Sequence, residues 1–202
     1  MPDLVQDNPS AKGAAERRGA LDGVTGPISA PGPTLVTILS PCARAVLRGG
    51  DDARAAFGAA LGLTLPTAVG RVAESDSRAV MCLGPDEWLA VAPLEDPAFA
   101  ALCEGEAPGC AVDVSHRQLA LSVTGPFAGT LLNAGCPLDL HASAFPPGAC
   151  TRTVCGKAEI VVWRRAIDRF HVETARSFAA YLWAFLEQAA MGLPPIPALM
   201  SG

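Results

Sequence analysis

The sequence predicts an α+β fold made of two similar α/β half-units with antiparallel sheets, packed together as one domain. The same order of elements, a strand, a helix, several further strands and a second helix, occurs twice along the chain. Residues 83–102 also resemble residues 163–182, with Asp86 matched to Asp168 and Trp88 matched to Phe170. Repetition of this kind indicates a duplicated supersecondary unit whose copies pack around a common core.

The first half is expected to cover about residues 34–105. Its expected elements are a strand at 34–39, a helix at 51–61, strands at 69–72, 79–83 and 87–92, and a helix at 97–103. Asp51 and Asp52 stand at the start of the first helix, where carboxylates favour the positive end of the helix dipole. They therefore need no catalytic role.

The second half is expected to cover about residues 111–190. Its expected elements are strands at 111–114 and 118–124, a helix at 126–134, strands at 150–155, 159–163 and 168–172, and a final helix. Gly135 is a suitable residue to end the helix at 126–134. The polar pair Arg164 and Arg165 suits a hairpin connection between the last two strands.

The final helix is expected to begin at Ser177, a favourable N-cap residue. Helical spacing gives it one continuous apolar face, made of Phe178, Tyr181, Leu182, Phe185, Leu186 and Ala189. Trp183 lies off this face, beside Ala180 and Ala184. A large aromatic among alanines is either an anchor for a partner protein or evidence that the chain covers this helix on both sides.

Both ends of the chain are expected to lie outside the core. Residues 1–33 mix Gly, Pro and charges without apolar spacing, which predicts a mobile arm with no apolar stretch of a signal peptide. Residues 191–202 form a Pro-rich tail, because Pro194 and Pro195 cannot continue a helix.

The composition favours a protein that binds other protein chains. Charged residues make up 17% of the sequence, against about 25% in an ordinary soluble domain. Surplus apolar surface without a run long enough to cross a bilayer indicates burial against partners. A net charge of −5 argues against nucleic acid. Seven cysteines without a secretory signal predict reduced thiols in the cytoplasm.

No assembled catalytic, cofactor-binding or metal site is expected. Residues 113–117, Asp-Val-Ser-His-Arg, contain nucleophile residue types, but neighbours on a strand point apart, so a tight turn capped by Asp113 and Ser115 is favoured. Cys150 and Cys155 have no second cysteine pair for a metal. Cys136 has no nearby His and is expected to be a small core residue. The glycine patterns of phosphate loops are absent from the sequence.

Several segments together resemble the gamma subunit of heterotetrameric sarcosine oxidase over about residues 34–190. They are LGPDEWLAVAP, DVSHRQLALSVTGP, LLNAGCPLDL, FPPGACTRTVCGKAEIVVWR and ETARSFAAYLWAFL, in this order and spacing. The resemblance implies a fold similar to the folate-binding domain of the glycine cleavage T-protein. It implies no catalytic residue on this chain.

The resemblance also implies partners and cofactors. The partners would be the alpha, beta and delta subunits of a bacterial complex that oxidises sarcosine to glycine with tetrahydrofolate as one-carbon acceptor. FAD, FMN, NAD and tetrahydrofolate would be bound by those subunits and not by this one. The alternative is a self-sufficient tetrahydrofolate-binding one-carbon (aminomethyl) transferase, which could draw on His116, Arg117 and Arg152, although their spacing does not force them together. A third alternative is a free hydrolase that uses Ser115 or Cys136.

Overall fold

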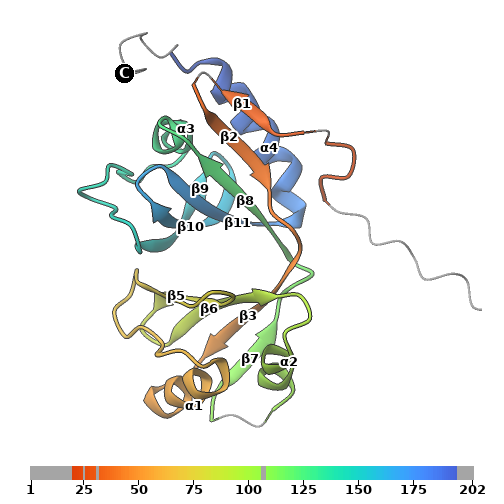
Figure 1. Ribbon diagram of the computed structural model, residues 1–202, viewed down its shortest axis with the longest axis vertical. Coiled ribbons are helices and arrows are strands. Elements are labelled where there is room, and N and C mark those ends of the chain that lie inside the picture. Colours follow the sequence, from red (N-terminus) through yellow and green to blue (C-terminus); the bar gives the residue numbers. More distant parts are fainter. Residues whose placement is uncertain (1–19, 25, 31, 106–107, 195–202) are drawn as a thin grey trace, which may run out of the picture.

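Two antiparallel β-sheets lie face to face, and helices cover their outer faces (Figure 1). The computed structural model describes residues 20–24, 26–30, 32–105 and 108–194. Buried apolar side chains form one cluster between each sheet and its helices and a third cluster between the two sheets. The predicted α+β architecture with antiparallel sheets is therefore confirmed.

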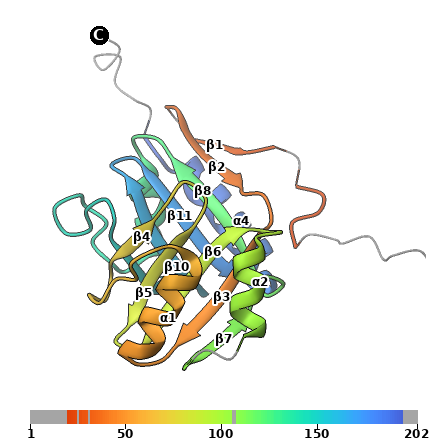
Figure 2. The ribbon, with the colours of Figure 1, turned by 60° about the horizontal axis from the view of Figure 1, so that its bottom comes forward.

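The five-stranded sheet has the strand order β4-β5-β6-β3-β7. Its strands are β3 (Cys42–Arg48), β4 (Val72–Glu74), β5 (Ala79–Gly84), β6 (Glu87–Pro93) and β7 (Cys110–Asp113). Helices α1 (Asp51–Leu61) and α2 (Pro97–Glu104) lie over its outer face (Figure 2). Because side chains alternate along a strand, Ala45 and Leu47 point from β3 toward Phe57 of α1 and Phe99 of α2.

The six-stranded sheet has the strand order β1-β2-β8-β11-β10-β9. Its strands are β1 (Ile28–Ala30), β2 (Thr34–Ile38), β8 (Gln118–Thr124), β9 (Cys150–Cys155), β10 (Ala158–Ala166) and β11 (Arg169–Ala175). Helices α3 (Ala128–Asn133) and α4 (Arg176–Met191) pack on its outer side. On β10, Ile160 and Val162 point toward these helices, whereas Val161 and Trp163 point toward the other sheet.

The duplication is visible in the strand orders. Without β1, the six-stranded sheet reads β2-β8-β11-β10-β9, and the five-stranded sheet, read from its other edge, is β7-β3-β6-β5-β4. Each position is thus filled by corresponding strands of the two repeats. The first strand of each repeat, however, joins the other repeat's sheet: β2 pairs with β8, and β7 pairs with β3. The predicted halves therefore do not coincide with the two sheets.

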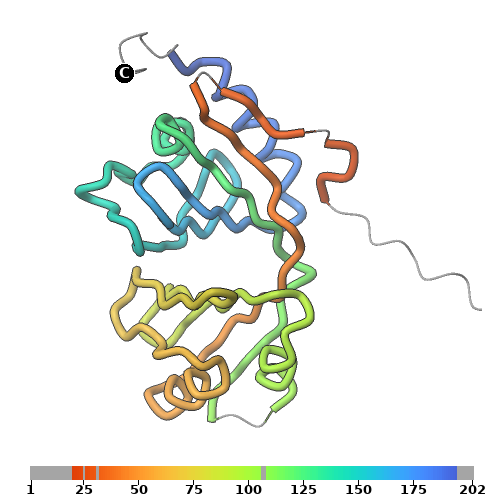
Figure 3. Tube along the Cα trace, viewed as in Figure 1, coloured from red at the N-terminus to blue at the C-terminus, as the bar shows by residue number. Residues whose placement is uncertain are grey.

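The chain crosses between the sheets twice, at residues 39–41 between β2 and β3 and at residues 114–117 between β7 and β8. These two connections run side by side (Figure 3). They are tied together by backbone hydrogen bonds, from Leu39 N to Ala120 O at 2.9 Å and from Val114 N to Arg44 O at 2.8 Å. This exchange of strands makes the two half-units depend on each other, because neither sheet is complete without a strand from the other repeat.

Strand β3 was missed by the sequence analysis, which expected no element between 39 and 51. Its sequence CARAVLR alternates small apolar residues with Arg44 and Val46, so it lacks the apolar run typical of a buried strand. The boundaries of the last hairpin also differ from the prediction. The hairpin connection lies at residues 167–168, because β10 continues through Arg164 and Arg165 to Ala166.

The predicted N-terminal arm is too long. Residues 28–30 pair with β2 as strand β1, and Leu21, Ile28 and Ala30 are buried in the core cluster beside α4. Burial of these side chains explains why the segment is ordered despite its polar, Gly/Pro-rich surroundings. Residues 1–19 and 195–202, which hold the rest of the predicted arm and most of the predicted tail, lie outside the described residues.

The N-cap of helix α4 lies two residues earlier than predicted, and the helix is rotated relative to the predicted face. Its N-cap is Ala175, without a side-chain hydrogen bond, so Ser177 is not the cap. The buried residues are Ala179, Leu182, Trp183, Leu186 and Ala190. Phe178 and Tyr181 are 41% and 37% exposed. The buried stripe is thus shifted by about one position toward the C-terminal side of the stripe that was predicted.

Candidate functional site

The inner faces of the two sheets bring charged side chains together in the centre of the molecule. Arg44 of β3 is only 2% exposed, and its Nε lies 2.6 Å from Oε2 of Glu173 on β11, whose side chain is fully buried. The other carboxylate oxygen of Glu173 lies 2.7 Å from Nε2 of His171. Arg44 also donates through Nη1 to the carbonyl of Cys42 at 3.0 Å. A buried charged pair thus joins an interior strand of one sheet to an interior strand of the other.

Glu173 is held in its charged form by these neighbours. Burial alone would raise the pKa of its carboxyl, but the hydrogen bond and charge of His171 and the charge and hydrogen bond of Arg44 together outweigh burial. The net effect is a pKa below the ordinary value for glutamate. Both oxygens of the carboxylate are occupied, so the group is arranged to hold the sheets together and not to exchange protons with a substrate.

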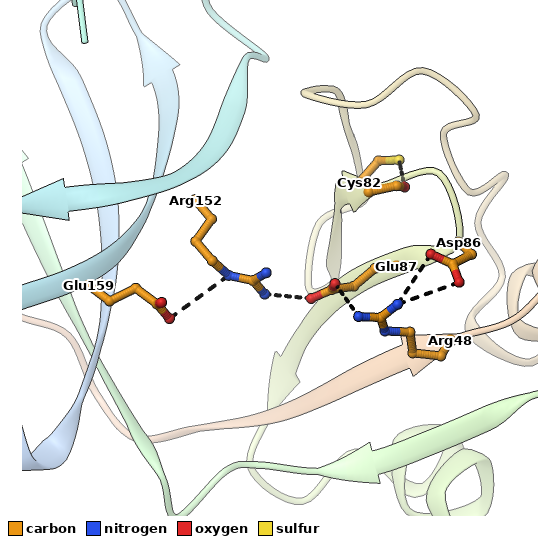
Figure 4. Close-up of polar contacts among 7 residues, drawn as sticks. Arg48, Cys82, Asp86, Glu87, Arg152 and Glu159 are labelled. Carbon is orange, nitrogen blue, oxygen red and sulfur yellow. Dashed lines mark hydrogen bonds and ion pairs between the residues drawn. The ribbon is translucent and has the colours of Figure 1, made fainter. Parts of the chain in front are cut away.

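A second network crosses between the sheets nearer the surface (Figure 4). Arg152 of β9 donates to Glu87 of β6 at 2.5 Å and lies 3.9 Å from Glu159. On its other side, Glu87 accepts from Arg48 at 2.8 Å, and Arg48 also contacts Asp86 at 3.2 Å. The hydrogen bond to Glu87 raises the pKa of Arg152. These charges are therefore committed to one another across the sheet interface.

The Asp113-to-Arg117 segment forms the predicted turn. Asp113 Oδ1 accepts from Ser115 N at 2.7 Å, and Arg117 N donates to Val114 O at 2.9 Å. The Ser115 hydroxyl oxygen in turn accepts from the backbone N–H of Arg44 at 2.8 Å. Ser115 thus fixes a connection between the sheets, and among the described residues its hydroxyl makes no hydrogen bond to a histidine ring.

All seven cysteines are free, and four of them are core thiols. Cys82, Cys136, Cys150 and Cys155 are buried, Cys42 and Cys103 are half-buried, and Cys110 is exposed. Cys150 lies between the sheets and Cys155 lies under the helices, as expected for strand positions of opposite parity. Burial raises the pKa of Cys150 to about 12 and that of Cys155 to about 11. Such thiols are poor nucleophiles and metal ligands.

The groups considered for a folate-binding alternative are not brought together. Arg117 lies in the turn before β8, whereas Arg152 lies on β9, and strands β11 and β10 separate β8 from β9 in the sheet. Arg152 is also occupied by Glu87. Within the described residues, no group of three or more His, Cys, Asp or Glu side chains is placed to hold a metal ion.

The three α4 residues predicted at a partner interface differ in their exposure. Trp183 is 7% exposed and belongs to the core cluster under α4, so it is not available as a surface anchor. The second explanation, a helix covered on this side by its own chain, is therefore the correct one for Trp183. Ala180 and Ala184 are exposed, and their contact with a partner stays a prediction.

Exposed large hydrophobic side chains are instead spread over several elements. They are Leu35, Ile38, Val69, Leu94, Val112, Val154, Ile167, Phe178, Tyr181 and Met191. Phe178 and Tyr181 come from the face of α4 that was predicted to be core. The composition predicted apolar side chains on the surface. It did not predict which residues these are, because that depends on how α4 is rotated and on which strands pair.

The sequence did not single out Arg44 and Glu173. Arg44 stands between Ala43 and Ala45, and Glu173 follows Val172; the two charged side chains point to the inner faces, while these apolar neighbours point to the helices. The only signal in the sequence was this alternation. It shows that both side chains share a face with buried residues, but it does not show that the two strands meet.

The fold and these contacts define a class of protein: a duplicated α+β domain whose central charged groups bind one another. Known proteins share this fold. One chain of the heterotetrameric sarcosine oxidase from Corynebacterium sp. U-96, in complex with pyrrole 2-carboxylate, superposes with a TM-score of 0.80 and 26% identity, covering 90% of this chain and 99% of that one. Glycine cleavage system aminomethyltransferase T from Bartonella henselae shares the fold at a TM-score of 0.54 and 14% identity, over 75% of this chain and 44% of that one.

The sequence identifies the family. Residues 49–192 match the model of the sarcosine oxidase, gamma subunit family. Sarcosine oxidase subunit gamma from Arthrobacter sp. is 38% identical over 128 residues, and that from Corynebacterium sp. strain P-1 is 36% identical over 137 residues. The matches cover 61% and 65% of this chain and 62% and 66% of these relatives, respectively. The chain belongs to the sarcosine oxidase, gamma subunit family.

In the described part of the chain, no helix is both long and apolar enough to cross a bilayer.

Proposed function

We propose that this chain is a non-catalytic gamma subunit of a heterotetrameric sarcosine oxidase. In that complex it would assemble with alpha, beta and delta subunits that oxidatively demethylate sarcosine to glycine, with tetrahydrofolate as one-carbon acceptor. The observation that carries the proposal is the family match over residues 49–192, together with the fit to a whole chain of a heterotetrameric sarcosine oxidase.

The internal chemistry of the chain supports a structural role. The charged groups at the sheet interface, such as Arg44, Glu173, Glu87 and Arg152, are engaged with one another. A catalytic acid or base must instead reach a substrate at hydrogen-bonding distance. Exposed apolar side chains supply surface that a partner could bury.

We further propose that FAD, FMN, NAD and tetrahydrofolate are bound by the partner subunits, and that the complex works in the cytoplasm. Seven free thiols are consistent with a reducing compartment. The alternative, a self-sufficient tetrahydrofolate-dependent transferase, is less favoured because the similarity to the T-protein is one of fold at 14% identity, and because Arg117, in the turn before β8, lies apart from Arg152 on β9.

Co-expression tests the proposal. The genes for the three candidate partner subunits are expressed with a tagged copy of this chain, and the tagged material is assayed for flavin absorbance and for sarcosine oxidation. We expect all four chains, flavin and activity to be recovered together, and neither flavin nor activity with the tagged chain expressed alone. Two results contradict the proposal. One is that the tagged chain, when co-expressed with the three candidate partners, is recovered without them. The other is micromolar binding of tetrahydrofolate by the isolated chain in a calorimeter.

A further inference from the structure

Strand β7 forms an open edge of the five-stranded sheet. It pairs with β3 on one side and is the last strand in the sheet order. Val114 N donates toward β3, to Arg44 O at 2.8 Å. Since hydrogen-bonding direction alternates along an antiparallel strand, Ala111 and Asp113 direct their backbone N–H and C=O groups away from β3. These are the groups to which a further strand would bond.

A groove runs along this edge, between β7 and α2. Its volume is about 780 Å³, and it is lined by the consecutive residues Ala111, Val112 and Asp113. Consecutive strand residues point to opposite faces, so a cavity that touches all three follows the edge of the strand. Phe99 and Cys103 of α2 form part of its other wall.

The other repeat shows what occupies the corresponding position. Strand β2 corresponds to β7 in the duplicated strand orders, and its outer edge is covered by β1, which pairs Ile28 with Val36 and lies against α4. Val36 is fully buried there. Matching the β2–β8 and β3–β7 registers aligns Val36 with Ala111, and Ala111 remains partly exposed. Within the described residues, β1 covers the outer edge of β2, but no strand covers the outer edge of β7.

The charge of the groove indicates the kind of strand that fits. Glu95, Glu104 and Asp113 line it and are exposed, whereas Asp96 is already paired with Arg78 at 2.7 Å. Burial raises the pKa of the Cys103 thiol in the groove wall, and the charges of Asp113 and Glu104 raise it further. A second copy of this chain would bring the same carboxylates to the same edge, which disfavours self-pairing. A basic segment would be attracted.

We propose that an extended, basic segment of a partner subunit adds to the five-stranded sheet as a strand beside β7, in the groove against α2. The inference rests on the proposed subunit role. Backbone hydrogen bonds to Ala111 and Asp113 supply the pairing, and basic side chains face Glu95 and Glu104. The added strand takes the position that β1 occupies in the other repeat.

Hydrogen exchange on the purified four-chain complex tests the added strand. We expect the backbone amides of Ala111 and Asp113 to exchange about a hundredfold or more slower than their intrinsic rates, as in the interior of a sheet. Fast exchange at these two amides in an intact complex overturns the added strand and leaves the subunit role standing. Failure to obtain a complex counts against the subunit role instead.

Charge reversal supplies a second test. In the tagged chain, the double variant Glu95→Lys and Glu104→Lys is expected to recover about tenfold less partner protein. Asp76→Lys is the matched control, because Asp76 is an exposed acid in the β4–β5 turn at the opposite edge of the same sheet, and its recovery should equal that of the wild type. Equal recovery with the double variant contradicts the proposal. If removal of residues 1–19 abolishes amide protection at β7, the strand beside β7 comes from this chain and not from a partner, and the proposal is also overturned.

Discussion

Arg44 and Glu173 carry opposite charges in a part of the molecule that excludes water. Taking one charge out of a buried pair leaves the other without compensation, and this is far more costly than losing an exposed pair. Contacts of Glu173 with both Arg44 and His171 make it the centre of the group. The pair also joins β3 to β11 and therefore one sheet to the other.

We expect Glu173→Gln to lower the free energy of unfolding by about 3–5 kcal/mol, since the Arg44 guanidinium stays buried without a carboxylate. Denaturant titration at low micromolar protein, followed by tryptophan fluorescence, measures the change. Glu159→Gln is the control, because the Glu159 side chain is 73% exposed and should cost less than about 1 kcal/mol. Equal effects of the two variants would show that the buried pair contributes no more than a surface pair.

The pH dependence follows from the same carboxylate. Its pKa in the folded chain lies below its ordinary value, so the folded chain binds that proton less readily than the unfolded chain. The stabilisation from Glu173 is therefore present above the pKa of the unfolded state and is lost as the pH falls through the folded pKa. Unfolding measured from pH 7 down into the acid range should show a shallower decline for Glu173→Gln than for wild type. Parallel declines would contradict this assignment.

Asp96 connects two elements. It is the N-cap of α2, accepting from Ala98 N and Phe99 N, and it binds Arg78 through both carboxylate oxygens. Arg78 also donates to Leu61 O at the end of α1, at 2.6 Å. The end of one helix and the start of the next are thus held by one arginine. These contacts lower the pKa of Asp96, led by the hydrogen bond from Arg78.

Two substitutions separate the roles of Asp96. Asp96→Asn keeps an N-cap acceptor but removes the charge paired with Arg78, whereas Asp96→Ala removes both. We expect Asp96→Ala to be less stable than Asp96→Asn by about 1 kcal/mol, the usual value of an N-cap. Thermal or denaturant unfolding measures this difference. If Asp96→Asn and Asp96→Ala unfold alike, the cap contributes nothing measurable and the ion pair accounts for the whole effect.

Helix α4 gives a prediction that the sequence pattern alone would have reversed. Trp183 is buried against the six-stranded sheet, while Phe178 is 41% exposed. Trp183→Ala should therefore cost about 3–5 kcal/mol through the cavity that it leaves. Phe178→Ala, the matched aromatic control on the same helix, should cost less than about 1 kcal/mol. The opposite ranking in an unfolding titration would support the face predicted from sequence.

The elements were easier to predict than their faces and partners. Strands β8 and β9 match their predicted ranges because their turns are marked by Gly and Pro and their apolar residues are regular. In α4, apolar and alanine residues surround the helix, so helical spacing alone allows more than one buried stripe. Gly135 was expected after α3 as a helix stop, and the structure adds a packing reason: a Cβ there would lie 2.6 Å from Cε1 of Phe185.

At the scale of the whole molecule, the exchange of β2 and β7 links the two repeats. No local pattern in the sequence encodes this exchange, because it depends on which strands meet after the chain crosses between sheets. The low content of charged residues, in contrast, can be counted from the sequence without knowing the fold. It predicted exposed apolar side chains, and the structure locates them.

Those exposed side chains predict how the isolated chain behaves. Phe178 and Tyr181 on α4 and Val154 on β9 are each more than a third exposed, and such surface favours association when no partner covers it. We expect the average mass of the purified chain in light scattering to rise with concentration, and co-expression with the partner subunits to prevent this rise. A monodisperse monomer at high concentration would count against an interface made of these residues.

Native mass spectrometry of the co-expressed complex tests whether this chain is a cofactor-free subunit of a four-chain enzyme. We expect one copy of this chain bound to one copy of each of three other subunits. On gas-phase dissociation, this chain should leave without any bound flavin, dinucleotide or folate. A free monomer of this chain beside a complete three-chain enzyme, or a released chain that retains one of those cofactors, would contradict the proposed role.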